Sequence, residues 1–528
     1  MHEALGIDAS VNRMTPDDLI SAILRAPVDL LWNGGIGTYV RATSETDAQV
    51  GDRANDPVRV TAKDVRAKAA GEGGNLGWTQ AGRIEYARNG GRINTDFIDN
   101  SAGVDTSDHE VNIKILLDAE VAAGRISEQE RDELLPAMAD DVASLVLRHN
   151  HSQNLALANA LSSDGPTAGV LEAWMCELEE SGHLDRAVDT MPSTTEMNRR
   201  MAAGERLASP ELCTLLAWTK IALCDAVLAT DLPEDPFVAD RLVGYFPLLL
   251  RERFTERMPT HRLHREIITT EAVNRFVDSQ GITAYYRLHL QTGADIAQVI
   301  RCQLAARSVF GLGRVETDLT HLGLDAVRTA KIRLALTDLA MHTTRWFLNH
   351  GGADDIAGTI ETYRPGVATL VEKLSERLLG DSADAWQEKV DEVTELGLDR
   401  SDAAVVAAYD WSPVLLSIVE ISEEGHSLDE VADAYLTLAR RVDMIRLTRL
   451  VEQLPQDRPT DARVRASLRV DLLRVMSDAT RRALVIGTDN VLADGGRIVK
   501  SIAANPDLAH CVVMVSDLRS AVGQEVTL

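Results

Sequence analysis

Residues 65–92 read VRAKAAGEGGNLGWTQAGRIEYARNGGR, and this stretch decides the fold of the N-terminal part of the chain. Residues 65–70 are a short candidate strand, and a glycine-rich loop follows at 71–75. Thr79 can cap a helix that runs to Arg88, and the pair Gly90-Gly91 ends it, because glycine commonly follows a helix C-terminus. The order strand, glycine loop, helix is typical of an α/β fold.

Two neighbouring stretches repeat this order. Thr15 can cap a helix that runs to about Arg25, and residues 28–32 then form a strand that leads into the loop NGGIG at 33–37. Residues 92–98 are a third candidate strand, followed by the loop DNSAG at 99–103. The repetition predicts an open parallel sheet over residues 1–104, in which ligands bind beyond the carboxyl ends of the strands.

The rest of the chain has a helical pattern. Leucine, alanine, arginine and glutamate dominate, and apolar residues recur at helical spacing. One such face is formed by Val367, Leu370, Val371, Leu374 and Leu378. The predicted fold class is therefore an α/β N-terminal portion followed by a large, mostly α-helical C-terminal region at 151–528, in one or more units.

Length and charge restrict the possible functions. The chain has 528 residues, of which 45% are hydrophobic, and a formal net charge of −27. Such a surface repels nucleic acid and anionic membranes, so neither is expected as a partner. The longest apolar run, at 242–250, is about half the roughly 20 residues that a membrane helix needs. The five cysteines form no CxxC pattern, which favours a reducing, cytoplasmic location.

The recognised cofactor and metal motifs are incomplete. Residues 71–76 and 311–316 each approach GxGxxG but lack its third glycine, and no GxxxxGK[ST] phosphate loop is present. The histidine pairs His149/His151 and His261/His264 have no carboxylate or cysteine at a metal-site spacing, so no metal is predicted. The run DTSDHE at 105–110 is interpreted as a helix N-terminus capped by Thr106 or Ser107, a position that can also receive a carboxylate.

GEGGNLG at 71–77 and NSAGVDTS at 100–107 resemble the "EGAN" and "NAGGVxxS" segments of glutamate dehydrogenases. The family that the chain resembles is that of the large NAD-specific glutamate dehydrogenases of bacteria. The resemblance extends to LLWNGGIGTYV (30–40), VGDRAND (50–56), GGRINTDFIDNSAGVDTSDHEVNIK (90–114), SPELCTLLAWTKI (209–221) and HREIITT (264–270).

The resemblance implies an oxidoreductase of amino-acid catabolism with NAD as cofactor, which deaminates L-glutamate to 2-oxoglutarate and ammonia. Asn75 and Asn100 correspond to residues at the nicotinamide end of the cofactor, and Asn33 and Gly34 are expected near it. Ser107 corresponds to the serine that binds the side-chain carboxylate of glutamate. The family also implies a homo-oligomer, and helices at 105–150 that return toward the substrate domain.

The departures from the family pattern lead to further expectations. In the family, the GxGxxG loop and the catalytic lysine and aspartate lie upstream of the segment that opens this chain, and none is recognisable here. The sequence therefore predicts an incomplete Rossmann-like dinucleotide-binding domain with an exposed strand edge, joined in the enzyme to a missing N-terminal part. We expect the chain alone to be inactive. The alternative is a non-catalytic helical assembly or regulatory module with a vestigial dehydrogenase segment.

Overall fold

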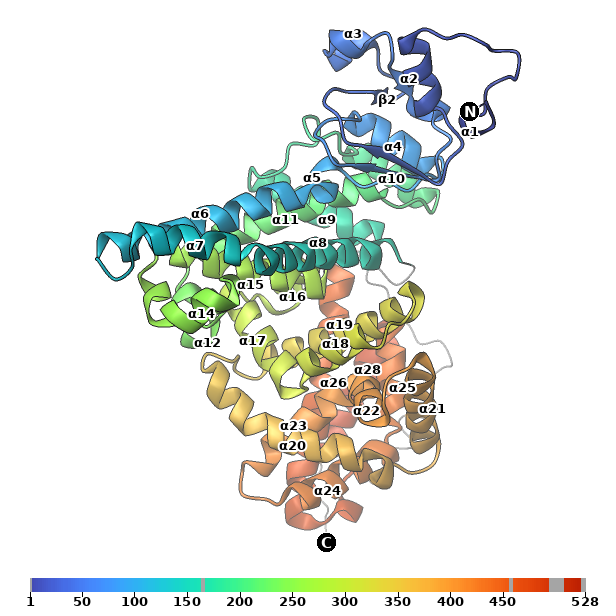
Figure 1. Ribbon diagram of the computed structural model, residues 1–528. Helices are drawn as coiled ribbons and strands as arrows, with labels where there is room; N and C mark the ends of the chain where they lie inside the picture. The colour runs from blue at the N-terminus through green and yellow to red at the C-terminus, as the bar shows by residue number, and fades with distance from the viewer. Residues whose placement is uncertain (1, 163–166, 455–458, 493–507, 524–528) are drawn as a thin grey trace. The chain divides into compact units, whose positions relative to one another are not determined.

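The computed structural model describes residues 2–162, 167–454, 459–492 and 508–523, which form two compact units, Met1–Thr283 and Ala284–Leu528 (Figure 1). The sequence predicts one or more units within the helical region 151–528, and the boundary between the two observed units lies inside this region. Most of the described residues are helical, as the sequence predicts for everything beyond the first hundred residues.

The strands of the first unit are short and parallel. β1 (Leu30–Asn33) pairs with β4 (Ala69–Glu72), and β2 (Val40–Arg41) pairs with β3 (Val60–Thr61). The expected continuous sheet is therefore replaced, in the described residues, by two separate two-stranded sheets. In β1, the side chains of Leu30 and Trp32 are each 57% exposed, so apolar groups face solvent beside this strand.

The first unit also contains helices and 3₁₀ turns around and after these strands. In the N-terminal segment they are α1 (His2–Leu5), α2 (Pro16–Leu24), α3 (Asp47–Val50), η1 (Arg53–Asn55), η2 (Ala62–Asp64), α4 (Gln80–Arg88) and α5 (Asp96–Asp99). The longer helices that follow are α6 (Ser101–Ala122), α7 (Glu128–Ala137), α8 (Ala139–Leu161), α9 (Ala168–Glu180), α10 (Thr194–Ala202), α11 (Ser209–Leu228) and α15 (His264–Gln280). Short elements precede α15: η3 (Leu232–Glu234), α12 (Pro236–Ala239), α13 (Arg241–Tyr245), α14 (Leu248–Phe254) and η4 (Thr255–Thr260).

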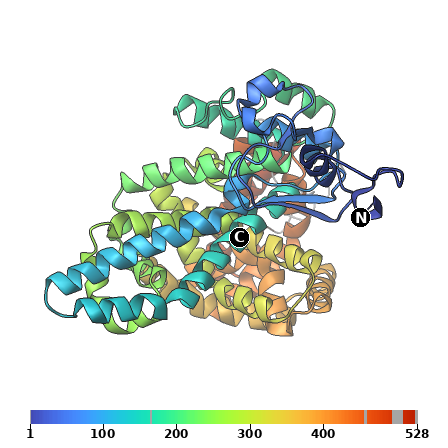
Figure 2. The same ribbon diagram turned by 45° about the horizontal axis from the view of Figure 1, so that its top comes forward.

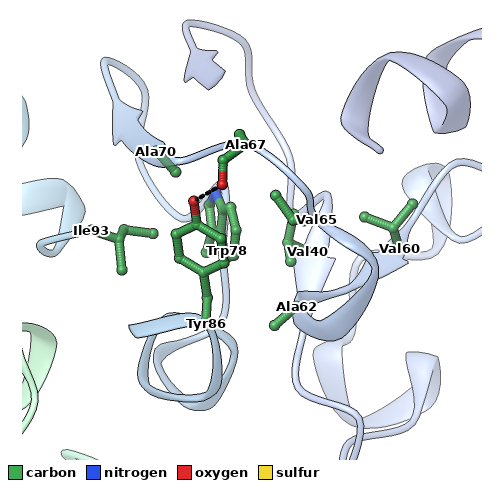
Figure 3. Close-up of a cluster of buried hydrophobic side chains, with 9 residues drawn as sticks. All are labelled: Val40, Val60, Ala62, Val65, Ala67, Ala70, Trp78, Tyr86 and Ile93. Atoms are coloured by element: carbon green, nitrogen blue, oxygen red, sulfur yellow. Dashed lines mark hydrogen bonds between the residues drawn. The ribbon is translucent and has the colours of Figure 1, made fainter. Parts of the chain in front are cut away.

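Two predicted helices are confirmed together with their caps. Thr15 accepts a hydrogen bond from the backbone of Asp18 at the start of α2, and Thr79 accepts one from Gly82 at the start of α4. A small apolar core holds α4 against the strands (Figure 3). In it, Tyr86 donates a hydrogen bond of 2.6 Å to the carbonyl of Ala67, and its ring lies 5.0 Å from that of Trp78. The buried members are Val40, Val60, Ala62, Val65, Ala67, Ala70, Trp78, Tyr86 and Ile93.

The prediction of a third strand at 92–98 is wrong. Arg92 forms a single parallel bridge with Ala69, and the chain then turns into α5. The side chain of Asp96 explains the turn, because it is buried and accepts a hydrogen bond of 2.8 Å from the backbone of Leu76. The second predicted strand also begins later than expected, at Ala69, because residues 62–64 form the 3₁₀ turn η2 and Val65 and Ala67 pack into the apolar core.

The long helices of the first unit pack against one another. α8 contacts α6, α11 and α15, and α11 also contacts α15, as both views show (Figures 1 and 2). α4 packs on α11, so the strand segment and the helical layer share an interface.

The second unit consists of helices in its described residues. They are α16 (Ala284–Thr292), α17 (Ile296–Val309), α18 (Leu312–His321), α19 (Ala326–Asn349), α20 (Ile356–Arg377), α21 (Asp381–Leu396), α22 (Arg400–Ala407), η5 (Ala408–Trp411), α23 (Ser412–Ser422), α24 (Leu428–Arg441), α25 (Met444–Glu452), α26 (Pro459–Ile486), η6 (Thr488–Asn490) and α28 (Leu508–Gly523). The apolar face predicted around Val367 and Leu374 is buried in α20, which packs on α17 and α23.

One stretch of this unit has the length and apolar composition of a membrane-spanning helix. Among the described residues, Arg400–Ser422 is apolar enough over a sufficient length, but 67% of its most apolar window is buried inside the protein. The stretch is also interrupted, because the 3₁₀ turn η5 separates α22 from α23. Burial of this kind is typical of core helices, and we interpret the segment as part of the core of the second unit.

Candidate functional site

The candidate site lies where β1 and β4 end. The strands are parallel and in register from Leu30 opposite Ala69 to Asn33 opposite Glu72, so the loops that follow both strands leave the same edge. The carbonyl of Asn33 accepts hydrogen bonds from the backbone N–H groups of Gly73 and Gly74, at 2.8 and 3.1 Å. The predicted glycine loops at 33–37 and 71–75 are thereby joined to each other.

Close backbone approach explains two of the glycines. A Cβ on Gly74 would lie 2.3 Å from the carbonyl oxygen of Gly35, and a Cβ on Gly73 would lie 2.9 Å from the ring of Trp32. Neither position has room for a side chain, so the indole of Trp32 and the loop 33–37 lie directly against the loop 73–77. Glycine here serves close packing of two loops, one of the uses expected at a ligand-binding edge.

Asn75 and Asn100, the two residues expected at the nicotinamide end, are in contact. The Nδ2 group of Asn100 donates to Oδ1 of Asn75 at 2.6 Å and to the carbonyl of Gly74 at 3.2 Å. Asn75 and Gly34 are exposed, whereas Asn100 is half-buried. The structure therefore brings Asn33, Gly34, Asn75 and Asn100 together at one edge.

The position of Ser107 differs from the prediction. The expected helix N-terminus at Thr106 or Ser107 is wrong, because α6 begins at Ser101, directly after the turn at Asn100. Ser107 consequently lies in the second turn of α6, about 10 Å along the axis from Asn100. Its side chain is exposed, but the free backbone N–H groups of a helix N-terminus are not available there to help bind a carboxylate.

A buried ion pair between Glu72 and Arg83 anchors the glycine loop that follows β4. Glu72 is fully buried, and Arg83 donates to it twice, from Nε at 2.6 Å and from Nη2 at 3.0 Å. The backbone N–H of Trp78 also donates to Glu72, at 3.0 Å, so the carboxylate connects both ends of the loop to α4. Burial raises the pKa of Glu72, and the charge of Arg83 opposes that rise. Sequence reasoning missed this pair, because nothing in the pattern links a strand-end glutamate to an arginine on the next helix.

α8 holds the start of α6 in place. Asn150 donates from Nδ2 to the carbonyl of Ile98 at 2.8 Å and to Oγ of Ser101 at 2.9 Å. Gln153 donates to the same hydroxyl at 3.0 Å. These bonds fix the turn that presents Asn100 to the glycine loop, so helices far along the chain position the candidate site.

A second polar cluster joins α6 to α8. Nδ1 of His149 lies 2.8 Å from Oδ2 of Asp105, and Nε2 of His109 lies 3.7 Å from the other oxygen of that carboxylate. These three side chains could each offer one ligand atom to a metal ion, all within 4.8 Å of one another. The sequence showed no carboxylate near His149, because Asp105 is distant along the chain and only the packing of α6 on α8 brings the two together.

The surroundings of the two histidines shift their pKa values in opposite directions. His109 is fully buried, stacks on Tyr245 with ring centroids 4.2 Å apart, and has its pKa lowered to about 4 by burial. The pKa of His149 is raised by its hydrogen bond to Asp105, with a further contribution from the charge of Glu271.

Two family models match the chain. The model for the catalytic domain of bacterial NAD-glutamate dehydrogenase matches residues 1–160, and the model for the C-terminal part of glutamate dehydrogenase matches residues 204–525. The chain belongs to the bacterial NAD-glutamate dehydrogenase family. The first match contains every residue named above at the ends of β1 and β4.

Curated proteins named NAD-specific glutamate dehydrogenase are similar to most of the chain. The protein of Mycobacterium tuberculosis is 41% identical over 92% of the chain, and that of Pseudomonas aeruginosa is 38% identical over 99%. The protein of Halomonas elongata is 36% identical over 90% of the chain. These matches cover 30%, 32% and 30% of the three relatives, so the chain spans about a third of their length.

Proposed function

We propose that this chain forms part of an NAD-dependent glutamate dehydrogenase, which deaminates L-glutamate to 2-oxoglutarate and ammonia. The observation that carries the proposal is the convergence of Asn33, Gly34, Asn75 and Asn100 where two parallel strands end. This edge lies within the residues that match the family's catalytic domain. Ligands of α/β proteins bind at such edges.

The nicotinamide end of NAD fits this edge. NAD supplies the acceptor for the hydride that leaves the α-carbon of glutamate. In this proposal, the amides of Asn75 and Asn100 orient the nicotinamide and its ribose, and the exposed backbone around Gly34 allows a ring to approach closely. The chain contains no complete GxGxxG loop, so we assign none of its residues to the pyrophosphate.

Ser107 is the proposed contact for the side-chain carboxylate of glutamate. The support is the resemblance of residues 100–107 to the family pattern and the exposure of the hydroxyl. Because Ser107 lies inside α6, the hydroxyl would act without the help of free backbone N–H groups. We expect the other charge contacts to the substrate to come from residues outside this chain.

The domain assignment follows from the same proposal. Residues 1–104 would be the C-terminal portion of a Rossmann-like dinucleotide-binding domain, supported by the parallel pairing of β1 with β4. Residues 105–150 would return toward the substrate domain, and 151–528 would form the helical C-terminal region. We further propose a cytoplasmic homo-oligomer, with a net charge of −27 that disfavours nucleic acid and membrane partners.

The proposal is tested by replacing Asn100 and Ser107 separately by alanine in a polypeptide that also carries the family's catalytic lysine and aspartate. Loss of a hydrogen bond to the cofactor should raise the KM for NAD roughly tenfold in Asn100→Ala. Loss of a bond to a charged group should raise the KM for glutamate by a similar factor in Ser107→Ala. Steady-state kinetics with each substrate varied in turn separates the two effects.

Asn198→Ala, an exposed position on α10, is the matched control and should change neither constant. If both constants stay at the wild-type values in both site variants, the assignment fails. The isolated 528-residue chain should show no glutamate-dependent formation of NADH. A normal turnover rate in that assay would refute the expectation that the acid and base of the reaction lie outside this chain.

A further inference from the structure

The second unit encloses a small cavity that the proposed function does not use. It has a volume of about 80 Å³ and lies between α19, η5, α25 and α26. Much of its wall is apolar, with Trp346, Met444 and Leu472 among the lining residues, and Arg345, Asn349 and Arg469 bring polar groups to it. An apolar cavity with a few convergent polar groups is the usual form of a small-molecule site.

Of the two arginines that line the cavity, Arg345 is buried, and Arg469, whose side chain is 13% exposed, has unsatisfied donors. Arg345 is 7% exposed, and its Nε donates to Oε1 of Gln291 at 2.7 Å. Arg469 pairs with Glu452 through Nη2, while its Nε and Nη1 atoms are buried without a hydrogen-bond partner. A buried charged donor without an acceptor is costly, so these atoms indicate a missing acceptor on the cavity side.

Positive charges are concentrated around the cavity. Burial lowers the pKa of Arg345 most, and the charges of Arg469 and Arg287 lower it further. Burial likewise lowers the pKa of Arg465, followed by the charge of Arg469. One carboxylate, Glu452, interacts with all four arginines.

Other charged groups lie at the margin. Asp338 faces Arg287, and Asp410 at the cavity wall is itself faced by Lys389 and Arg449. An added negative charge between Arg345 and Arg469 would relieve the repulsion and supply the acceptor.

We propose that this cavity binds a small organic carboxylate. Its carboxyl group would accept hydrogen bonds from Arg345 and Arg469, and its short apolar part would pack against Trp346 and Met444. Planar guanidinium groups match a carboxylate in geometry as well as in charge. The cavity volume of about 80 Å³ restricts the ligand to a few carbon atoms.

The bound carboxylate would connect two helices of the second unit. Arg345 belongs to α19 and Arg469 to α26, so a ligand held by both joins segments that are far apart in the chain. A ligand that binds only the folded unit stabilises it by RT ln(1 + [L]/Kd), so the stabilisation grows with the logarithm of the ligand concentration. This proposal does not depend on the proposed function of the first unit, because every residue in it lies beyond the unit boundary.

The test uses the full 528-residue chain with sodium propionate as the probe, compared with sodium phosphate and sodium chloride at equal ionic strength. Propionate should raise the unfolding temperature more than either of the other salts, and calorimetric titration should show one site per chain. Arg469→Gln should weaken propionate binding at least about tenfold, because a hydrogen bond to a charged group is lost. The matched control is Arg474→Gln, an exposed position on the same helix, which should bind like the wild type.

A second variant keeps the test decisive if Arg469→Gln fails to fold. Arg345→Lys retains the positive charge but loses the planar fork, and it should also weaken propionate binding. The proposal is overturned if propionate has no effect beyond that of chloride, or if the variants that fold bind it like the wild type. Tighter binding of phosphate than of propionate would also overturn it, since the site would then select a tetrahedral anion.

Discussion

At the scale of single residues, the candidate site depends on backbone positions where a side chain cannot fit. Gly74 is the clearest case, because its added Cβ would lie 2.3 Å from a backbone oxygen that cannot rotate away. We expect Gly74→Ala to reduce the free energy of unfolding by about 1–3 kcal/mol, the usual cost of overpacking. Urea-induced unfolding measures this change.

Gly103→Ala is the control for that prediction. Gly103 lies inside α6 with open space around its Cβ position, so alanine should be neutral or slightly stabilising there. Equal effects of the two substitutions would contradict the close approach of the two loops.

His109 should make the protein less stable in acid. Its pKa is lowered to about 4 in the folded chain, against about 6.5 when unfolded, so the unfolded state binds a proton first as the pH falls. The stability that neutral His109 contributes is complete above pH 6.5 and is lost between pH 6.5 and about 4. His109→Phe retains an aromatic ring against Tyr245 but cannot bind a proton. Over this pH range, its free energy of unfolding should fall by up to about 3 kcal/mol less than that of the wild type.

His149 provides a comparison of opposite sign. Its pKa is raised in the folded chain, so its contribution is complete below the unfolded pKa and is lost as the pH rises through the folded value. His149→Gln should therefore cost more stability at pH 5.5 than at pH 8, the opposite of the trend expected for His109. Unfolding curves at both pH values distinguish the two histidines.

At the scale of elements, the pair Glu72–Arg83 joins β4, the glycine loop and α4. Arg83→Met should destabilise the protein by about 3–5 kcal/mol, because it leaves a buried carboxylate without its counter-charge. Adding Glu72→Gln to that variant should recover part of the loss. A double-mutant cycle by thermal unfolding measures the coupling.

The exposed pair Lys68–Asp29 is the control for this cycle. Both side chains are more than four-fifths exposed, so Lys68→Met should produce no measurable change in unfolding. A loss in Lys68→Met as large as that in Arg83→Met would show that burial is not the cause.

Local signals predicted the elements well only where a cap or a glycine determines the boundary. α2 and α4 begin after Thr15 and Thr79 as expected, since those hydroxyls accept the first free backbone N–H groups. The third strand failed because residues 92–98 satisfy a strand pattern, yet Asp96 forms bonds to distant residues that favour a helical turn. The helix N-terminus predicted at Thr106 or Ser107 failed for a different reason, since α6 begins at Ser101 and continues through Gly103.

At the scale of the whole molecule, the two compact units should unfold separately. Each has its own buried core, so calorimetry of the chain should show more than one transition. Arg83→Met should lower the temperature of one transition, and propionate should raise that of the other. A single transition that both perturbations shift equally would mean that the two units unfold as one.

The sequence by itself determined the family, the mostly helical character and the glycine loops near a strand end. These features depend on short sequence segments, on the spacing of apolar residues and on turn residues, all of which are local properties of the chain. Only the tertiary structure decided that Asn100 contacts Asn75, that Arg83 pairs with Glu72, that Asp105 meets His149 and that Arg345 and Arg469 share one cavity. Such contacts arise when helices and loops distant in the chain pack together to bury apolar surface, and no local pattern encodes which polar groups this packing brings into contact.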